Sequence, residues 1–201
     1  FDLMIDCGEN TYMNWKNSGY KWERLKIILI THMHFDHIGG LIPLLFYRKI
    51  KKVKGKILIV GPKPLKKLME LSFQYQKIDI REYIKFINVS EIRSFRFNSS
   101  SIDITAKQMV HKIDCWGYRI ADKLKSLVFM TDTIPNENSI LLSTDADILI
   151  HEATYLDSDK VKALKQFHST PNQAKEIAQT ANVKRLFLTH FSENINKNQK
   201  Q

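Results

Sequence analysis

One stretch of ten residues decides the fold: Thr31-His32-Met33-His34-Phe35-Asp36-His37-Ile38-Gly39-Gly40. It follows the apolar run from Leu25 to Ile30, which is short and rich in β-branched residues and therefore predicts a buried strand. Three histidines and one aspartate within six residues are hard to explain by packing. Imidazole and carboxylate side chains crowded at the end of a strand indicate metal coordination.

The spacing inside this stretch predicts how the ligands are shared. Side chains alternate along an extended chain, so His32 and His34 should point the same way and bind one ion. Asp36 and His37 come where the chain turns into a helix expected from Ile38 to Arg48, and they can face a second ion. Neutral imidazole and carboxylate suit zinc, with manganese or iron as substitutes. The two glycines that follow indicate close backbone approach beneath the site.

Three further ligand-type residues have the same placement at the exit of an apolar run. His111 follows the strand-like segment from Ile102 to Val110. Asp132 follows Leu127-Val128-Phe129, and His190 follows Leu186-Phe187-Leu188. Each alone could be a capping aspartate or a half-buried histidine. Together, beside the first stretch, they favour a site for two metal ions.

Two more motifs contain histidine. Ile148-Leu149-Ile150 leads into His151-Glu152-Ala153-Thr154, where His151 is expected to orient a metal ligand from behind. His168 precedes Ser169-Thr170-Pro171, which predicts a helix with Thr170 as its N-cap and Gln173 completing a capping box. A helix N-terminus favours anions such as phosphate, so His168 is expected to take a direct chemical role.

These motifs together resemble the metallo-β-lactamase superfamily and, within it, ribonuclease Z, the tRNA 3′-processing endonuclease. The segments that carry the resemblance span almost the whole chain: Ile5-Asp6-Cys7-Gly8-Glu9, Thr31 to Gly40, His111 with Cys115 to Ile120, Asp132, His151 to Thr154, His168 to Thr170 and Thr189 to Ser192. The resemblance implies an α/β fold, a four-layer αββα sandwich, in a single domain over residues 1–201. Relatives carry strands before the position of Phe1, so N-terminal strands are expected to be missing.

The resemblance and the ligand pattern also imply a mechanism. One ion takes His32, His34 and His111, the second takes Asp36, His37 and His190, and Asp132 bridges them. A water between two cations loses its proton near neutral pH and attacks phosphorus in line. Asp36 orients or deprotonates that water, His168 stabilises the phosphate or protonates the leaving oxygen, and Glu152 holds the His168 imidazole.

One departure from the ribonuclease Z pattern bears on the substrate. Only twenty residues separate His111 from Asp132, an interval that in ribonuclease Z often holds a long arm gripping the tRNA body. Such an arm is not expected here. A phosphodiesterase for cyclic or short nucleotides therefore stays open, as does a non-catalytic, metal-stabilised RNA-binding module. A lactamase or thioesterase fits the His151 and His168 segments less well.

Composition sets the remaining expectations. A length of 201 residues suits one domain, and the sequence shows no linker, repeat or long apolar run that would predict a membrane span. Two cysteines favour a reducing compartment, here the cytoplasm. The net charge of +10 fits an RNA partner, and the basic run from Arg48 to Lys56 could contact its phosphates. Trp116 and Tyr118 could stack on a base. The alternative for the basic run is a solvated surface, and the alternative for the two aromatic residues is core packing. The chain can be a monomer or a homodimer.

Overall fold

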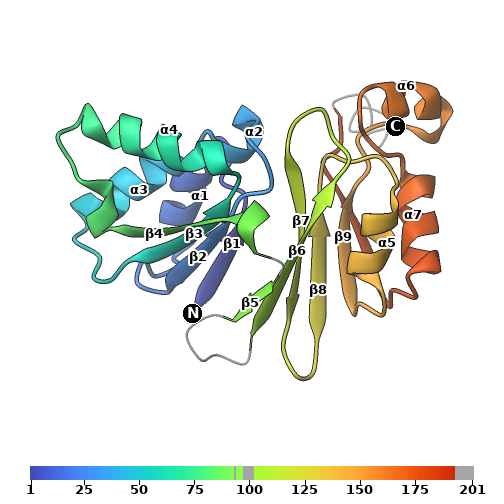
Figure 1. Ribbon diagram of the computed structural model, residues 1–201, viewed down its shortest axis with the longest axis horizontal. Coiled ribbons are helices and arrows are strands. Elements are labelled where there is room, and N and C mark those ends of the chain that lie inside the picture. Colours follow the sequence, from blue (N-terminus) through green and yellow to red (C-terminus); the bar gives the residue numbers. More distant parts are fainter. Residues whose placement is uncertain (93, 97–101, 193–201) are drawn as a thin grey trace. The chain divides into compact units, whose positions relative to one another are not determined.

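The computed structural model describes residues 1–92, 94–96 and 102–192. These residues form two compact units, which divide between Glu91 and Ile92. Each unit contains one β-sheet with helices packed on it (Figure 1). The predicted α/β class is therefore confirmed. Among the described residues, no helix has the length and apolar character needed to cross a membrane.

The first unit holds a four-stranded parallel sheet in the order β1-β2-β3-β4. Its elements, in chain order, are β1 (Asp2–Ile5), α1 (Thr11–Asn17), β2 (Leu25–Leu29), α2 (Phe35–Ile38), α3 (Leu41–Ile50), β3 (Ile57–Gly61), α4 (Lys63–Gln74), η1 (Ile80–Glu82), β4 (Ile84–Asn88) and η2 (Val89–Glu91). Parallel neighbours require crossover connections, and these contain α1, α3 and α4. Leucines of α3 and Leu65, Met69 and Phe73 of α4 pack against Ile28, Ile57 and Ile59 of the sheet.

The second unit holds a six-stranded mixed sheet in the order β10-β9-β8-β7-β6-β5. Its elements are β5 (Ser94–Arg96), β6 (Asp103–Met109), β7 (Cys115–Ala121), β8 (Ser126–Met130), α5 (Glu137–Ser143), β9 (Ile148–Glu152), η3 (Asp157–Asp159), α6 (Lys160–Lys165), α7 (Pro171–Thr180) and β10 (Leu186–Thr189). Strands β5 to β8 pair antiparallel, and β8, β9 and β10 pair parallel. Leu142 of α5 and Ile177 of α7 pack on Val128 and Leu149.

Parallel pairing gathers strand ends at one edge of each sheet. In the first unit Ile5 pairs with Leu29, so Asp6 and the segment after β2 leave the sheet side by side. In the second unit Met130 pairs with His151, and Thr189 pairs with Glu152. The polar residues that follow β8, β9 and β10 therefore meet at one edge.

The helix expected from Ile38 to Arg48 is broken in the structure. A short helix, α2, ends at Ile38, and α3 begins at Leu41. Gly39 and Gly40 lie between them, and their low helix propensity explains the break. The predicted helix at Pro171 is confirmed as α7, including the capping box of Thr170 and Gln173.

Candidate metal centre

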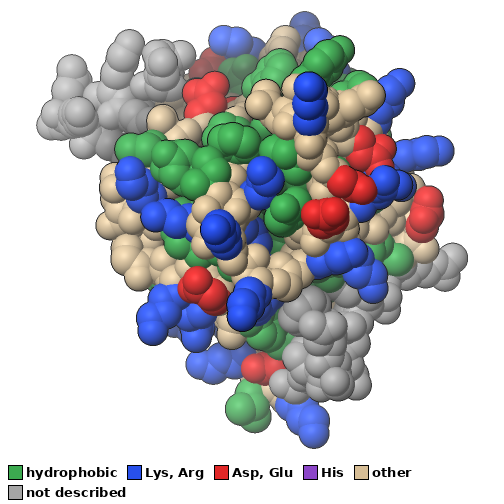
Figure 2. Space-filling model, turned by 90° about the vertical axis from the view of Figure 1, so that its left-hand side faces the viewer, with side chains coloured by type: hydrophobic (Ala, Val, Ile, Leu, Met, Phe, Trp, Pro, Cys, Tyr) green, Lys and Arg blue, Asp and Glu red, His purple; other side chains and the backbone are tan. Residues whose placement is uncertain are grey.

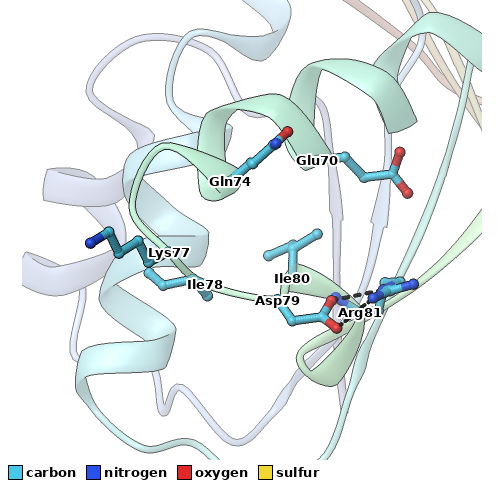
Figure 3. A pocket seen from close by; sticks show the side chains of 7 residues that line it. All are labelled: Glu70, Gln74, Lys77, Ile78, Asp79, Ile80 and Arg81. Carbon is cyan, nitrogen blue, oxygen red and sulfur yellow. Dashed lines mark hydrogen bonds and ion pairs between the residues drawn. The ribbon is translucent and has the colours of Figure 1, made fainter.

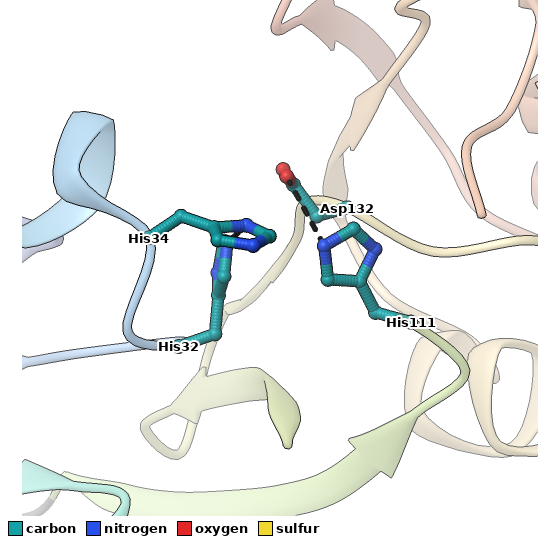
Figure 4. A group of neighbouring side chains, drawn as sticks. All are labelled: His32, His34, His111 and Asp132. Atoms are coloured by element: carbon teal, nitrogen blue, oxygen red, sulfur yellow. Dashed lines mark hydrogen bonds and ion pairs between the residues drawn. The ribbon is translucent and has the colours of Figure 1, made fainter. Parts of the chain in front are cut away.

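The histidines after β2 lie against one another. The Nε2 atom of His32 is 2.9 Å from the Nδ1 atom of His34, and the rings meet edge to face at 86° (Figure 4). This contact is what alternation along an extended segment predicts. Two imidazole nitrogens at this separation can serve as ligands to one cation.

Asp36 and His37 form a second pair at the start of α2. The Nε2 atom of His37 is 3.2 Å from a carboxylate oxygen of Asp36. The other ring nitrogen, Nδ1, lies 2.7 Å from Asp6. Because a carboxylate only accepts hydrogen bonds, Nδ1 donates to Asp6 and Nε2 is turned toward Asp36.

Asp6 is a site residue to which sequence reasoning assigned no role. Its carboxylate accepts hydrogen bonds from the backbone and the hydroxyl of Thr31 as well as from His37. Its backbone has a φ of 58°, a conformation that is costly for a residue other than glycine and clusters at functional sites. The available signal was a lone aspartate at the end of a strand. Its partners are 25 and 31 residues away, so the contacts could not be predicted from spacing.

The glycines of this loop are required by close backbone approach, as predicted. A Cβ atom on Gly40 would lie 2.1 Å from the carbonyl oxygen of Gly8, and one on Gly8 would lie 2.0 Å from that of Asp36. No side chain fits at these distances. The loop that bears the ligands is thus held directly against the backbone after β1.

The second unit gathers its own ligand-type residues around Asp132. Its carboxylate oxygens lie 3.2 Å from Nε2 of His190 and 3.8 Å from Nε2 of His111; the latter ion pair is drawn in Figure 4. Asp132, His168 and His190 each offer a ligand atom within 4.8 Å of the others. Asp132 and His190 both have positive φ values, 52° and 58°, so the fold holds strained backbone at this edge.

Nδ1 of His111 is fixed by the main chain. It lies 3.1 Å from the carbonyl oxygen of Phe167, which can only accept a hydrogen bond. Nδ1 therefore carries the proton, and Nε2 is the atom turned toward Asp132.

Glu152 is the hydrogen-bonding centre of the second unit. Its fully buried carboxylate accepts from Nδ1 of His168 at 3.0 Å. It also accepts from the backbone of Thr133 and Ser169 and from Thr154. Burial opposes ionisation, but the hydrogen bonds from His168, Thr154 and Ser169 outweigh it and hold the pKa of Glu152 below its usual value. The expected contact between Glu152 and His168 is present.

Thr154 is the second residue that sequence reasoning left without a role. Its hydroxyl lies 2.7 Å from Glu152 and 2.9 Å from Nδ1 of His190. A threonine after a strand is common, and His190 is 36 residues away. Nothing in the sequence therefore distinguished this hydroxyl from an ordinary loop residue.

His151 lies apart from these contacts. Its side chain is fully buried, and Nδ1 bonds the carbonyl oxygen of Glu152 at 2.8 Å. Nε2 is buried without a hydrogen-bond partner among the described residues. Burial lowers the pKa of His151, which keeps the ring neutral. Its expected role behind a ligand stays a prediction.

A surface hollow of about 440 Å³ in the first unit lies between the end of α4 and η1. Asp79 and Arg81 form a two-point ion pair along its wall (Figure 3). This ion pair neutralises two of the charged side chains that line the hollow. Its lining includes no histidine, so it offers no comparable chemistry.

The basic run divides into a buried and an exposed part. Arg48 is 2% exposed and donates to the carbonyl oxygens of Trp22 and Gly55, so it anchors the end of α3 and is not a phosphate contact. Lys51, Lys52 and Lys54 are exposed. Figure 2 shows Lys and Arg spread across the side that carries α3 and α4, with no single stripe.

The two aromatic residues near His111 also differ. Tyr118 is fully buried on β7, so packing explains it. Trp116 is half-buried, and its ring nitrogen donates to Asp114. Only Trp116 therefore offers a surface on which a base could stack.

Comparison with known proteins identifies the class. The family model of the β-lactamase superfamily domain matches residues 2–191, so the chain belongs to this superfamily. Within the superfamily it is similar to ribonuclease Z of Bacillus mycoides strain KBAB4, with 29% identity over 94% of this chain and 78% of the relative. The predicted resemblance to ribonuclease Z is confirmed.

Solved structures agree with this assignment. The short form of human tRNase Z is 28% identical, with a TM-score of 0.84 over 96% of this chain and 83% of that chain. The metallo-β-lactamase fold protein YhfI of Bacillus subtilis is 25% identical, with a TM-score of 0.77 over 98% and 79%. The predicted metallo-β-lactamase fold is confirmed.

Proposed function

We propose that the protein is a ribonuclease Z-like endonuclease, a metal-dependent phosphodiesterase that removes 3′ trailers from precursor tRNA. One observation carries the proposal: similarity to ribonuclease Z of Bacillus mycoides extends over 94% of the chain and 78% of that relative. The products would be a tRNA with a free 3′-hydroxyl and a trailer with a 5′-phosphate.

The donor set fits divalent cations. Imidazole nitrogens and carboxylate oxygens suit zinc, and manganese or iron can substitute. The separation of 3.2 Å between a carboxylate oxygen of Asp132 and Nε2 of His190 supports this fit. In the proposed assignment, one ion is held by His32, His34 and His111, a second by Asp36, His37 and His190, and both by Asp132. When bound, the two cations acidify water and neutralise charge on the phosphate.

Two side chains are proposed to act on the attacking water and on the substrate. Asp36, with its side chain 62% exposed, is proposed to orient the attacking water and accept its proton. His168 donates through Nδ1 to buried Glu152, and we propose that its other ring nitrogen faces the substrate. We assign to that nitrogen the contact with the phosphate or the proton given to the leaving oxygen.

The grip on tRNA differs from that of an arm-bearing enzyme. Between His111 and Asp132 the structure contains only β7 and β8, and β6 and β7 join through residues 110–114. We propose that Lys51, Lys52 and Lys54, together with the general positive charge, supply the phosphate contacts instead.

The short β6–β7 connection also favours one alternative, a phosphodiesterase for cyclic or short nucleotides. Assaying one metal-replete preparation on precursor tRNA and on a chromogenic phosphodiester separates the two functions. Cleavage of the tRNA at its 3′ trailer supports the proposal. Rapid turnover of the small phosphodiester with no cleavage of precursor tRNA would replace it with the alternative.

Assembly and location are further proposals. An apolar groove of about 330 Å³ between α3 and α4, lined by Ile42, Phe46 and Phe73 among others, supports a homodimer, which sedimentation analysis tests. Cys7 and Cys115 are both free and buried, and burial raises the pKa of Cys7 to about 12. Two protected thiols support the cytoplasm as the location.

A further inference from the structure

We propose that Lys162 of α6 binds a backbone phosphate of the RNA next to the scissile one, and that Tyr155 is the residue that positions this lysine. The side chains involved all belong to the second unit. The proposal rests on the proposed function, in which His168 acts on the scissile phosphate. It adds a point of contact that only a substrate with several phosphates can use.

Tyr155 and Lys162 form a pair of side chains close to His168. The ammonium nitrogen of Lys162 lies over the Tyr155 ring, 5.4 Å from its centroid, which is within the range of a cation–π interaction. The centroid of the same ring is 6.0 Å from that of the His168 imidazole. One aromatic ring therefore lies beside both the cation and the histidine that is proposed to act on the substrate.

Backbone hydrogen bonds fix the segments that carry this pair. The N–H of Tyr155 donates to the carbonyl oxygen of Ser169 at 3.3 Å. The N–H of His168 donates to the carbonyl oxygen of Ala163 at 2.9 Å. Ala163 follows Lys162 in α6 and is fully buried. The helix that carries the lysine is thus anchored to the segment that carries His168.

The charge of Lys162 is not neutralised by an ion pair. Lys162 is exposed, and no carboxylate pairs with it in the part of the chain that the structure describes. A ring face attracts an ammonium group but does not cancel its charge, so the group can still donate to a phosphate oxygen. Among the described residues, Lys160 and Lys165 of the same helix lie over no aromatic ring. Tyr155 therefore singles out Lys162.

RNA binding tests the role of the lysine. Lys162→Met removes the charge and keeps most of the side-chain length. The metal-replete protein is titrated, at several salt concentrations, with a precursor tRNA that carries a non-hydrolysable linkage at the cleavage site. We expect affinity at low salt to fall about tenfold, near the lower end of what a hydrogen bond to a charged group contributes. The slope of log Kd against log salt should fall by about one.

Two lysines of the same helix provide matched controls. Lys160→Met and Lys165→Met each remove one positive charge from α6, and each should have a smaller effect on affinity and on the salt slope. Equal effects of the three substitutions would overturn the proposal, because Lys162 would then contribute only to the net charge.

Neutralising single phosphates of the RNA identifies the partner of Lys162. A methylphosphonate replaces one charged oxygen by a methyl group, and it is placed in turn at the linkages on either side of the cleavage site. At one of these positions the wild type should lose affinity and Lys162→Met should lose little more. If neither position removes the difference between the wild type and Lys162→Met, the lysine does not bind a neighbouring phosphate.

Substitutions of Tyr155 test the positioning role. Tyr155→Phe keeps the ring and should retain the affinity and salt dependence of the wild type. Tyr155→Leu removes the ring, so adding Lys162→Met should then cost less affinity than it does in the wild type. Full additivity would remove Tyr155 from the proposal. If Tyr155→Leu does not fold, an upfield ring-current shift of the Lys162 side-chain protons in the wild type reports the contact, and its absence overturns the positioning role.

Failure of the proposed function gives a different result. The wild type is also incubated with a cleavable precursor tRNA under the same conditions. If it binds RNA with the expected dependence on Lys162 but cleaves none, the proposed function fails and the phosphate contact stands. If it cleaves the RNA while Lys162→Met behaves like Lys160→Met and Lys165→Met, the phosphate contact fails and the proposed function stands.

Discussion

Asp36 and His37 are neighbours in the chain with opposite surroundings. The side chain of His37 is 7% exposed and held by Asp6, whereas that of Asp36 is 62% exposed. Both were predicted as ligands because they lie in one dense stretch of ligand-type residues. Asp6 and Thr154 were not predicted, since isolated polar residues at strand ends are common and their partners are distant in sequence.

The proposed role of the Asp36 carboxylate predicts the effect of removing it. Asp36→Ala should abolish turnover and weaken one metal site, because the carboxylate is proposed to bind an ion and to orient water. The fold should survive, since the core of the unit is built from the apolar runs. Turnover, metal content and thermal unfolding are measured together, with Glu70→Ala on α4 as the exposed-carboxylate control. Turnover near that of the wild type would remove Asp36 from the mechanism.

The substitution of His168 is expected to affect turnover but not metal content. It lies outside the proposed ligand sets and bonds Glu152, so His168→Ala should retain both metal ions. Turnover should fall by roughly 10²–10⁴-fold, the usual contribution of general acid–base help. Elemental analysis and single-turnover kinetics check both parts. Loss of metal alongside activity would mark His168 as a ligand or a structural residue.

At the scale of elements, local signals predicted individual helices and strands, such as β2 and α7. The capping box predicted α7 from Thr170, Pro171 and Gln173, because these signals are local. The helix expected from Ile38 to Arg48 was wrong at Gly39 and Gly40. The prediction gave too little weight to the low helix propensity of the two glycines. The reason for glycine at position 40 is its close approach to Gly8, which is distant in sequence.

Those contacts predict a sensitive position. In Gly40→Ala the new Cβ would lie 2.1 Å from the carbonyl oxygen of Gly8, so the backbone after β1 or the ligand loop must move. We expect a loss of about 1–3 kcal/mol in the free energy of unfolding, as for an overpacked core, together with weaker metal binding. Denaturant unfolding and metal titration measure the two effects.

Gly55→Ala provides the comparison. Gly55 has a positive φ of 82° but open space around its Cβ position. Its substitution should cost stability without affecting metal binding. Equal effects of the two substitutions on metal binding would contradict the importance of close approach at Gly40.

At the scale of the whole molecule, the sequence predicted the superfamily better than the substrate. The ligand motifs are spread over the whole chain, but each one is a short stretch of sequence. A single sequence therefore reveals the pattern. Substrate choice depends on surface geometry, for which net charge is a weak guide. Arg48 illustrates the limit: it counted toward the basic run, yet it is buried and bonded to backbone carbonyls.

The exposed part of that run gives a prediction about RNA. Reversing the charge of Lys51, Lys52 and Lys54 to glutamate should weaken binding to precursor tRNA and make affinity less dependent on salt, because fewer counterions are released. Reversal of Lys63, Lys66 and Lys67, which are also exposed in the first unit, controls for net charge. If tRNA cleavage at moderate salt is unchanged by the first set, these lysines are a solvated surface.

The central claim is a centre of two metal ions built from seven side chains. Removing metal with a chelator, restoring it with excess zinc and measuring zinc per chain tests this claim most directly. The seven proposed ligands, sorted into two sets with one shared carboxylate, predict about two ions per chain and recovery of turnover with the second. A stoichiometry of one or less under saturating metal would contradict the account.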